Sequence, residues 1–259
     1  MYPILLRFGD FELRSYGVIV ALSFLAGLWL NRKEAARKGL EPALIGEFSV
    51  YAIIAGVIGA RLYFILFSDP VSYLNKPWEI LAVWHGGIGV IGSLIGGFLA
   101  ALWFCRKKQI RLLKFADVLV PGVALGQTLG QFACLAKGDS YGKPTGLPWA
   151  ITYTDPRSLA PLNIPLHPIE IYEMAAYFIV FLVVWTTRKR FKADGFSFLT
   201  YLAAYGTARF VMEFFRGQPA LFAGGVPAAQ VVGATVVLAS AFGFYWLRSS
   251  RDQKRSTKE

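Results

Sequence analysis

The sequence predicts an all-α polytopic membrane protein with about seven transmembrane helices. Hydrophobic residues make up 55% of the 259-residue chain and charged residues only 17%, proportions that a soluble domain of this length would not show. Several apolar stretches of about 20 residues are long enough to cross the hydrocarbon core of a bilayer. The formal net charge is nevertheless +11. The basic residues must therefore lie outside that core, where their distribution indicates the topology.

Seven apolar stretches follow one another along the chain. The third is dense in glycine, which membrane helices tolerate because it lets their backbones pack closely. The fifth begins at Pro168, a residue favoured in the first turn of a helix. Glu170 and Glu173 follow in its first turns, where the helix dipole favours acidic side chains. To within a few residues, the expected spans are 15–31, 43–67, 79–105, 115–136, 168–187, 195–213 and 226–247.

Every second connection between these spans is basic. Clusters of lysine and arginine follow the first, third, fifth and seventh spans, at 32–38, 106–114, 188–192 and 248–258. Cytoplasmic loops have an excess of such residues. The sequence therefore predicts an N-terminus outside the cytoplasm and a C-terminus inside, in the cytoplasmic (inner) membrane of a bacterium.

We expect one integral membrane domain, residues 1–259, with a periplasmic cap inserted at 137–166. This connection is rich in glycine and proline, and Trp149, Ile151 and Tyr153 alternate in it as in a short strand. Charged residues interrupt the first 17 positions too often for a cleaved signal peptide. Cys105 and Cys134 fall near opposite faces of the membrane, so no disulfide is expected.

Ionisable residues within the expected spans indicate a functional site, because a charge in the hydrocarbon core is costly unless it is paired or hydrated. Arg209, Glu213 and Arg216 are spaced i, i+4 and i+7, which places them on one helix face, and Tyr205 extends that face by a turn. Arg61 is a further charge, in the second span. Two interpretations remain open: an internal salt bridge between helices, or a site for an anionic lipid headgroup formed by two cations around one carboxylate.

Two other patterns have weaker functional interpretations. One pattern consists of possible metal ligands, His167, Glu170 and Glu173. The sequence has no second His or Cys cluster to complete a coordination shell, so no metal is expected. Positioning of a substrate or of the cap is the preferred interpretation. Gly87 to Gly92 matches G-x-G-x-x-G without the strand and acidic residue that a dinucleotide site requires. Close helix packing through Gly92, Ser93, Gly96 and Gly97 explains this run better.

Taken in order, six segments resemble the landmarks of the prolipoprotein diacylglyceryl transferase family: LRSYGVIVALSF, GARLYFIL, WHGGIGVIGSLIGG, ALGQTLGQFACLAKGDSYGKPT, LHPIEIYEM and YGTARFVMEFFRG. The resemblance implies transfer of the diacylglyceryl group of phosphatidylglycerol to the lipobox cysteine thiol of a prelipoprotein, with release of glycerol phosphate. It implies these two substrates and membrane lipids as partners. It implies neither a metal nor an organic cofactor, and no nucleic acid.

The resemblance also implies roles for individual residues. The residues expected to be catalytic are Arg209, Glu213, Tyr205 and Tyr16. Those expected to bind phosphatidylglycerol are Gln131, Arg61, Arg216, Asp139, Gly142, His167 and Glu173. In this set Asp139 stands where many members have glutamate.

Two positions depart from the family pattern. Gln131 replaces an arginine of the signature, and Ile91 stands where an aromatic residue or histidine is usual. A neutral amide in place of a charged contact costs roughly 2 to 4 kcal/mol in a dry site. Three interpretations stay open: a slow transferase, a transferase compensated by Lys137 or Lys143, and a lipid-binding paralogue without catalysis. A transporter would predict internal repeats, or charged residues on several spans that line one path, and the sequence indicates neither.

Overall fold

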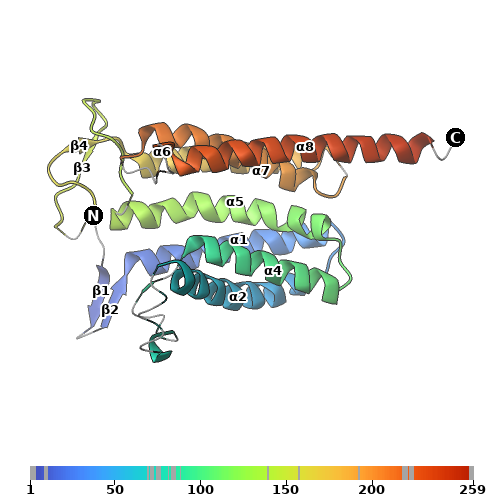
Figure 1. Ribbon diagram of the computed structural model, residues 1–259, viewed down its shortest axis with the longest axis horizontal. Helices are drawn as coiled ribbons and strands as arrows, with labels where there is room; N and C mark the ends of the chain where they lie inside the picture. The colour runs from blue at the N-terminus through green and yellow to red at the C-terminus, as the bar shows by residue number, and fades with distance from the viewer. Residues whose placement is uncertain are drawn as a thin grey trace. The chain divides into compact units, whose positions relative to one another are not determined.

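The computed structural model is predominantly helical, with two small two-stranded sheets (Figure 1). It describes residues 4–8, 11–68, 70, 73, 77–80, 82, 86–87, 89–138, 140–156, 158–191, 193–217, 221 and 225–256, and at 4–14 and 250–256 the backbone alone. The chain divides into two compact units. One consists of residues up to Leu30 and from Leu119 onwards, and the other of Asn31–Val118.

Seven long helices of the described chain correspond to the seven expected spans. They are α1 (Ser15–Arg37), α2 (Ala43–Ser68), α4 (Val90–Lys107), α5 (Leu112–Lys137), α6 (Ile169–Thr187), α7 (Phe196–Met212) and α8 (Ala228–Ser256). All except the 17-residue α7 are long and apolar enough to cross a bilayer. The predicted fold class, an all-α polytopic membrane protein, is confirmed.

Two departures from the expected elements concern the chain's N-terminal half. Residues before α1 form an antiparallel hairpin of β1 (Ile4–Phe8) and β2 (Phe11–Arg14), which the sequence analysis did not predict. The third span was expected from residue 79, but α4 begins only at Val90. Before it lie a short 3₁₀ helix, η1 (Pro77–Ile80), and two glycines with positive φ, Gly86 and Gly87, a conformation that ends a helix.

In the unit Asn31–Val118, α2 and α4 cross at glycines. A Cβ added at Gly92 would lie 2.1 Å from the carbonyl oxygen of Gly59, and one added at Gly96 would lie 2.1 Å from that of Ala55. The predicted role of the glycine run in close helix packing is therefore confirmed for Gly92 and Gly96. It is wrong for Gly97, whose Cβ position has nothing within 4 Å among the described residues.

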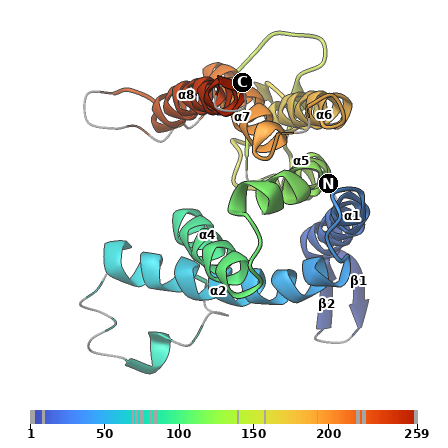
Figure 2. The same ribbon diagram turned by 90° about the vertical axis from the view of Figure 1, so that its right-hand side faces the viewer.

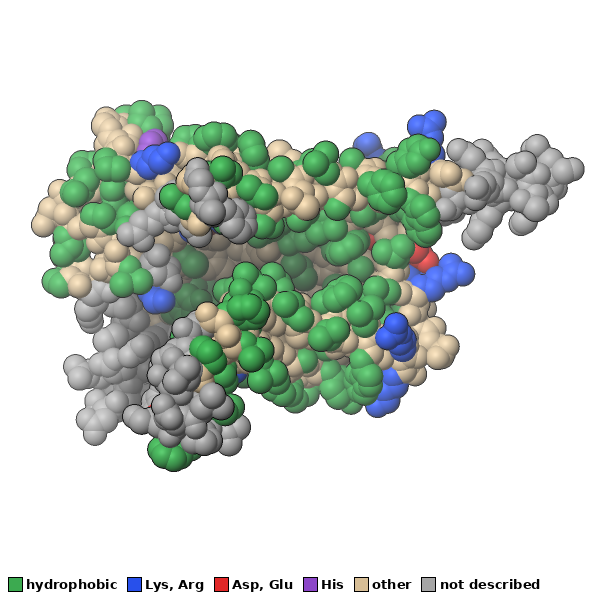
Figure 3. Space-filling view, in the orientation of Figure 1, with side chains coloured by type: hydrophobic (Ala, Val, Ile, Leu, Met, Phe, Trp, Pro, Cys, Tyr) green, Lys and Arg blue, Asp and Glu red, His purple; other side chains and the backbone are tan. Residues whose placement is uncertain are grey.

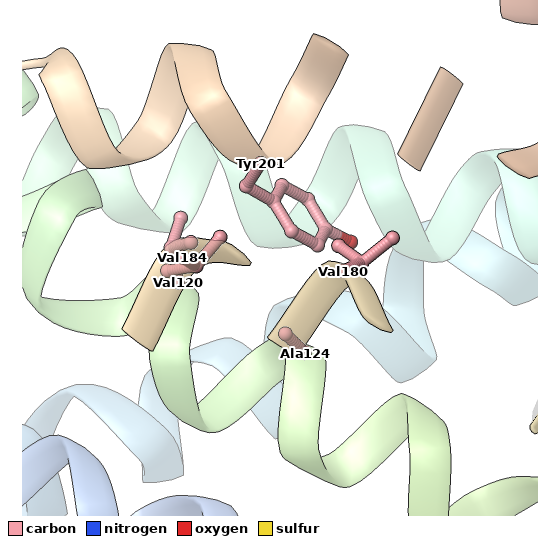
Figure 4. Packing of buried hydrophobic residues seen from close by; sticks show 5 residues of the cluster. All are labelled: Val120, Ala124, Val180, Val184 and Tyr201. Atoms are coloured by element: carbon pink, nitrogen blue, oxygen red, sulfur yellow. The ribbon is translucent and has the colours of Figure 1, made fainter. Parts of the chain in front are cut away.

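In the other unit, α6, α7 and α8 run side by side (Figure 2). Gly206 of α7 faces Gly233 of α8 at similarly close range. The core of this unit joins α5, α6 and α7 through a cluster of buried side chains, Val120, Ala124, Val180, Val184 and Tyr201 (Figure 4). On the face drawn in Figure 3, apolar side chains cover the length of the helices, as expected for surfaces that meet lipid.

The connection between α5 and α6 folds over a small core of its own. Strands β3 (Ile151–Thr152) and β4 (Pro165–Leu166) pair antiparallel, and Tyr153, Ala160 and Leu166 are buried together. The hydroxyl of Tyr153 donates to Glu170 Oε1 over 2.9 Å, which ties this connection to the first turn of α6. The predicted strand-like alternation is found at Ile151 and Tyr153, whereas Trp149 lies in a turn and is exposed.

Candidate active site

Four charged side chains meet where α6 begins and α7 ends. Glu173 comes from the second turn of α6. Arg209 lies in the last turn of α7, after which the chain tightens into a 3₁₀ turn, η3 (Glu213–Phe215), and becomes extended at Arg216. The helical spacing keeps Arg209 and Glu213 on one face, and the 3₁₀ turn brings the side chain of Arg216, three residues on, over that of Glu213. We call these four residues the ion cluster.

Glu173 is the centre of the ion cluster. Its Oε1 accepts hydrogen bonds from Arg209 Nη1 at 2.8 Å and from Arg216 Nη2 at 2.6 Å. Glu213 Oε2 lies 3.6 Å from Arg209 Nη2 and 3.5 Å from Arg216 Nε. The expectation of two cations around one carboxylate was therefore wrong, because Glu173 adds a second carboxylate and the cluster is neutral overall.

The carboxylates of the ion cluster are more deeply buried than the guanidinium groups. Side-chain exposure is 3% for Glu173 and 1% for Glu213, against 22% for Arg209 and 24% for Arg216. Glu213 Oε2 and Arg216 Nε have no hydrogen-bond partner in the described part of the chain. Buried carboxylates thus hold two arginines whose accessible edges can donate to an anion such as a phosphate diester.

Tyrosines extend the same face of α7 away from the ion cluster. Tyr205 stacks on Tyr201, with ring centroids 5.6 Å apart and planes 14° apart, and lies 5.6 Å from Tyr177 of α6. The Tyr201 hydroxyl donates to Gln127 Oε1 of α5 over 2.8 Å. Tyr177, Tyr201 and Gln127 were not among the residues expected at the site. The i, i+4 series from Tyr201 through Tyr205 to Arg209 could have indicated Tyr201, but nothing local indicates the partners on α5 and α6.

Gln131, the residue in place of the family arginine, lies on α5 one turn beyond Gln127. The residue is half-buried, and its Oε1 is buried without a hydrogen-bond partner among the described residues. A buried amide oxygen without a partner is uncommon in folded proteins. It leaves Gln131 able to accept a hydrogen bond from a ligand.

The cap fixes the position of Arg216 through backbone contacts. Gly142 forms a β-bridge with Arg216, and the Lys143 amide donates to the Phe215 carbonyl over 2.9 Å. A Cβ at Gly142 would lie 2.5 Å from both the Cβ and the carbonyl oxygen of His167. Only glycine fits there, and the resemblance had indicated this position without giving the reason.

The three side chains considered as metal ligands face three different partners. Glu173 binds the two arginines, and Glu170 accepts from Tyr153. His167 Nδ1 lies 3.3 Å from the Tyr172 hydroxyl, and its ring packs against Tyr172 and Phe215. The contacts of Glu170 and His167 connect the start of α6 to the cap, and positioning of a substrate or of the cap by this segment stays a prediction.

Tyr16, another expected site residue, contacts the last residue of α5. Lys137 Nζ stands 5.4 Å from the ring centroid of Tyr16, which lies in the first turn of α1 and is 42% exposed. This contact places a cation beside the expected catalytic tyrosine. Asp139 lies outside the described residues.

Arg61 belongs to the unit Asn31–Val118, where the residue is 4% exposed and its guanidinium binds backbone carbonyls. It donates to Gly86 at 2.5 Å, to Gly87 at 3.0 Å and to Ile80 at 3.1 Å, and also to Glu79. These bonds fold the segment before α4 around the arginine. Binding of phosphatidylglycerol by Arg61 stays a prediction, and the observed contacts favour a structural role.

Known proteins resemble this chain along almost its entire length. The family described as prolipoprotein diacylglyceryl transferase matches residues 3–246. The phosphatidylglycerol–prolipoprotein diacylglyceryl transferase of Clostridium tetani is 33% identical over 245 residues, covering 94% of this chain and 97% of the relative. The proteins of that name from Synechococcus elongatus and Thermotoga maritima are each 32% identical, covering 95% and 96% of this chain and 87% and 86% of theirs. The chain therefore belongs to the prolipoprotein diacylglyceryl transferase family.

Proposed function

We propose that this protein transfers the diacylglyceryl group of phosphatidylglycerol to the lipobox cysteine of prelipoproteins, in the cytoplasmic (inner) membrane of a bacterium. The observation that supports it most is the ion cluster on α6 and α7, found in a chain that matches the family over residues 3–246. A phosphate diester needs donors that remain charged, and arginine supplies them in a fixed fork.

In the proposed reaction the sulfur of the cysteine forms a bond to a glycerol carbon of the lipid, and the bond from that carbon to the phosphate oxygen breaks. The proton that the thiol loses balances, in the net reaction, the proton gained by the departing phosphate. The departing glycerol phosphate keeps the electron pair, so stabilisation of its charge lowers the barrier. Arg209 and Arg216 would supply that stabilisation from their exposed edges, while Glu173 and Glu213 hold both guanidinium groups in position.

The neutrality of the ion cluster makes additional cations important for this step. Lys143 is exposed and is joined through its backbone to Phe215, next to Arg216. Lys137 lies over the ring of Tyr16. Both positions support the interpretation in which a lysine compensates for the missing signature arginine.

One observation favours a second candidate, a relative that binds anionic phospholipid or lipoprotein precursors without catalysis. Gln131 brings an amide instead of a charge, and the structure gives its buried Oε1 no partner among the described residues. Such a residue can bind a lipid hydroxyl while stabilising a leaving phosphate poorly.

Complementation of a bacterial strain depleted of its own transferase tests the proposal. Expression of this chain should restore growth and the lipid-modified form of a reporter lipoprotein, whereas Arg209→Ala at equal membrane levels should restore neither. Failure of the wild-type chain at normal membrane levels, together with retained phosphatidylglycerol binding, would favour the non-catalytic relative.

A further inference from the structure

A second feature of the molecule, unrelated to the ion cluster, is an apolar groove along α2 and α4. It has a volume of about 600 Å³, and every lining residue is aliphatic, aromatic or glycine. The glycine crossing of the two helices forms its floor, because small residues there leave room between the larger side chains on either side. The half that leads to the C-terminal end of α4 is lined by Tyr51, Ile54, Ile58, Ile95, Leu99 and Trp103.

At this end of the groove an aromatic pair lies beneath a lysine. The rings of Tyr51 and Trp103 meet edge to face with centroids 5.0 Å apart. Lys107 Nζ stands 4.8 Å from the Trp103 centroid and 6.0 Å from that of Tyr51. These contacts place the ammonium group beside the aromatic end of the groove.

Lys107 differs from its neighbour in how its charge is balanced. Lys108 Nζ forms an ion pair with Glu47 Oε2 at 2.8 Å and lies over the ring of Phe104. No such pair with a carboxylate is found for Lys107 among the described residues. The groove therefore ends at a positive charge that a ligand can neutralise.

We infer that this groove binds one membrane phospholipid with an anionic headgroup, with the phosphate at Lys107 and an acyl chain along α2 and α4. One leaflet provides about 15 Å of hydrocarbon, or about ten helical residues. Tyr51 to Ile58 and Trp103 to Ile95 cover most of that length, starting from the lysine. The basic cluster that contains Lys107 is the one expected in the cytoplasm, so the lipid belongs to the cytoplasmic leaflet. The inference does not depend on the proposed transfer reaction.

Photocrosslinking in nanodiscs of phosphatidylcholine tests the site on the full-length chain. Phosphatidylglycerol with a diazirine in its acyl chain serves as probe, and phosphatidylcholine with the same acyl chain serves as comparison. Peptide mapping should place crosslinks from the first lipid on 51–58 and 95–103. Lys107→Gln should lower their yield roughly fivefold, the effect of one basic residue beside an anionic lipid. Lys108→Gln, whose charge is already paired with Glu47, should leave it unchanged.

A second pair of variants tests whether the acyl chain lies in the apolar part of the groove. Ile58→Trp fills the groove and should remove these crosslinks, whereas Ile53→Trp, at a comparably exposed position outside the groove, should keep them. Loss of these crosslinks alone, with those at other peptides retained, excludes unfolding as the cause. Equal labelling by both lipids, or equal effects of Lys107→Gln and Lys108→Gln, would overturn the inference.

Discussion

Glu173 determines how the two arginines of the ion cluster are held, because one of its oxygens accepts from both. The spacing of Arg209, Glu213 and Arg216 could be predicted from sequence, since it follows from helical geometry alone. The place of Glu173 between the arginines could not, because it depends on the packing of α6 against α7. The prediction of a positively charged site failed for this reason.

Glu173→Gln should lower the free energy of unfolding by about 3 kcal/mol. The change leaves two guanidinium groups with one carboxylate, and the value is at the low end for a buried pair because both arginines are partly exposed. Denaturant unfolding in mild detergent measures it. Glu47→Gln, which breaks the half-exposed pair with Lys108, is the matched control and should cost about 0.5 kcal/mol. Equal effects of the two variants would show that the ion cluster does not stabilise the fold.

Gln131→Arg should raise the rate of diacylglyceryl transfer roughly ten- to a thousand-fold, as expected for one restored charge-assisted contact. Gln131→Glu keeps the size of the side chain and should lower the rate if Gln131 lines the phosphate site as proposed, because it brings a negative charge to that site. Initial rates with labelled phosphatidylglycerol measure both. If Gln131→Arg is neutral or harmful and the wild type is fast, another cation performs this role, and Lys143→Ala or Lys137→Ala should then abolish turnover.

At the scale of the elements, the sequence predicted the order and approximate positions of the long helices, and its largest error was the start of α4. Residues 79–89 are apolar enough to extend a span, so hydropathy alone placed the start of α4 too early. Arg61 determines the actual conformation, since its donors are satisfied by carbonyls of η1 and of Gly86 and Gly87. Such contacts between an arginine and a distant backbone segment leave no periodic signal in the sequence.

Gly92→Ala should destabilise the packing of α2 against α4 by about 2 kcal/mol. The added methyl group would fall 2.1 Å from a backbone carbonyl, which cannot move aside as a flexible side chain could. Gly97→Ala lies five residues along the same helix, with nothing within 4 Å of its Cβ position, and should change stability by less than about 0.5 kcal/mol. Thermal unfolding of the two purified variants compares them, and equal midpoints would contradict the assigned crossing.

At the scale of the whole molecule, the alternation of basic connections predicts which loops face the cytoplasm. Reporter fusions after Lys114 and after Arg190 should report cytoplasm, and a fusion at Asp155, between α5 and α6, should report periplasm. A cytoplasmic signal at Asp155 would contradict the predicted topology. It would also place the ion cluster, which the cap contacts through Arg216, on the wrong side of the membrane for the proposed substrates.

The measurement that tests the proposed activity most directly is transfer by the purified full-length chain. It uses phosphatidylglycerol labelled in its diacylglyceryl part and a lipobox peptide, with mass spectrometry of the peptide as readout. We expect a diacylglyceryl thioether on the cysteine and release of glycerol phosphate, with no product from a peptide in which serine replaces that cysteine and none from Arg209→Ala. If the wild type and Gln131→Arg both fold and bind phosphatidylglycerol but neither forms the thioether, the proposed activity is contradicted and the chain is a lipid-binding relative.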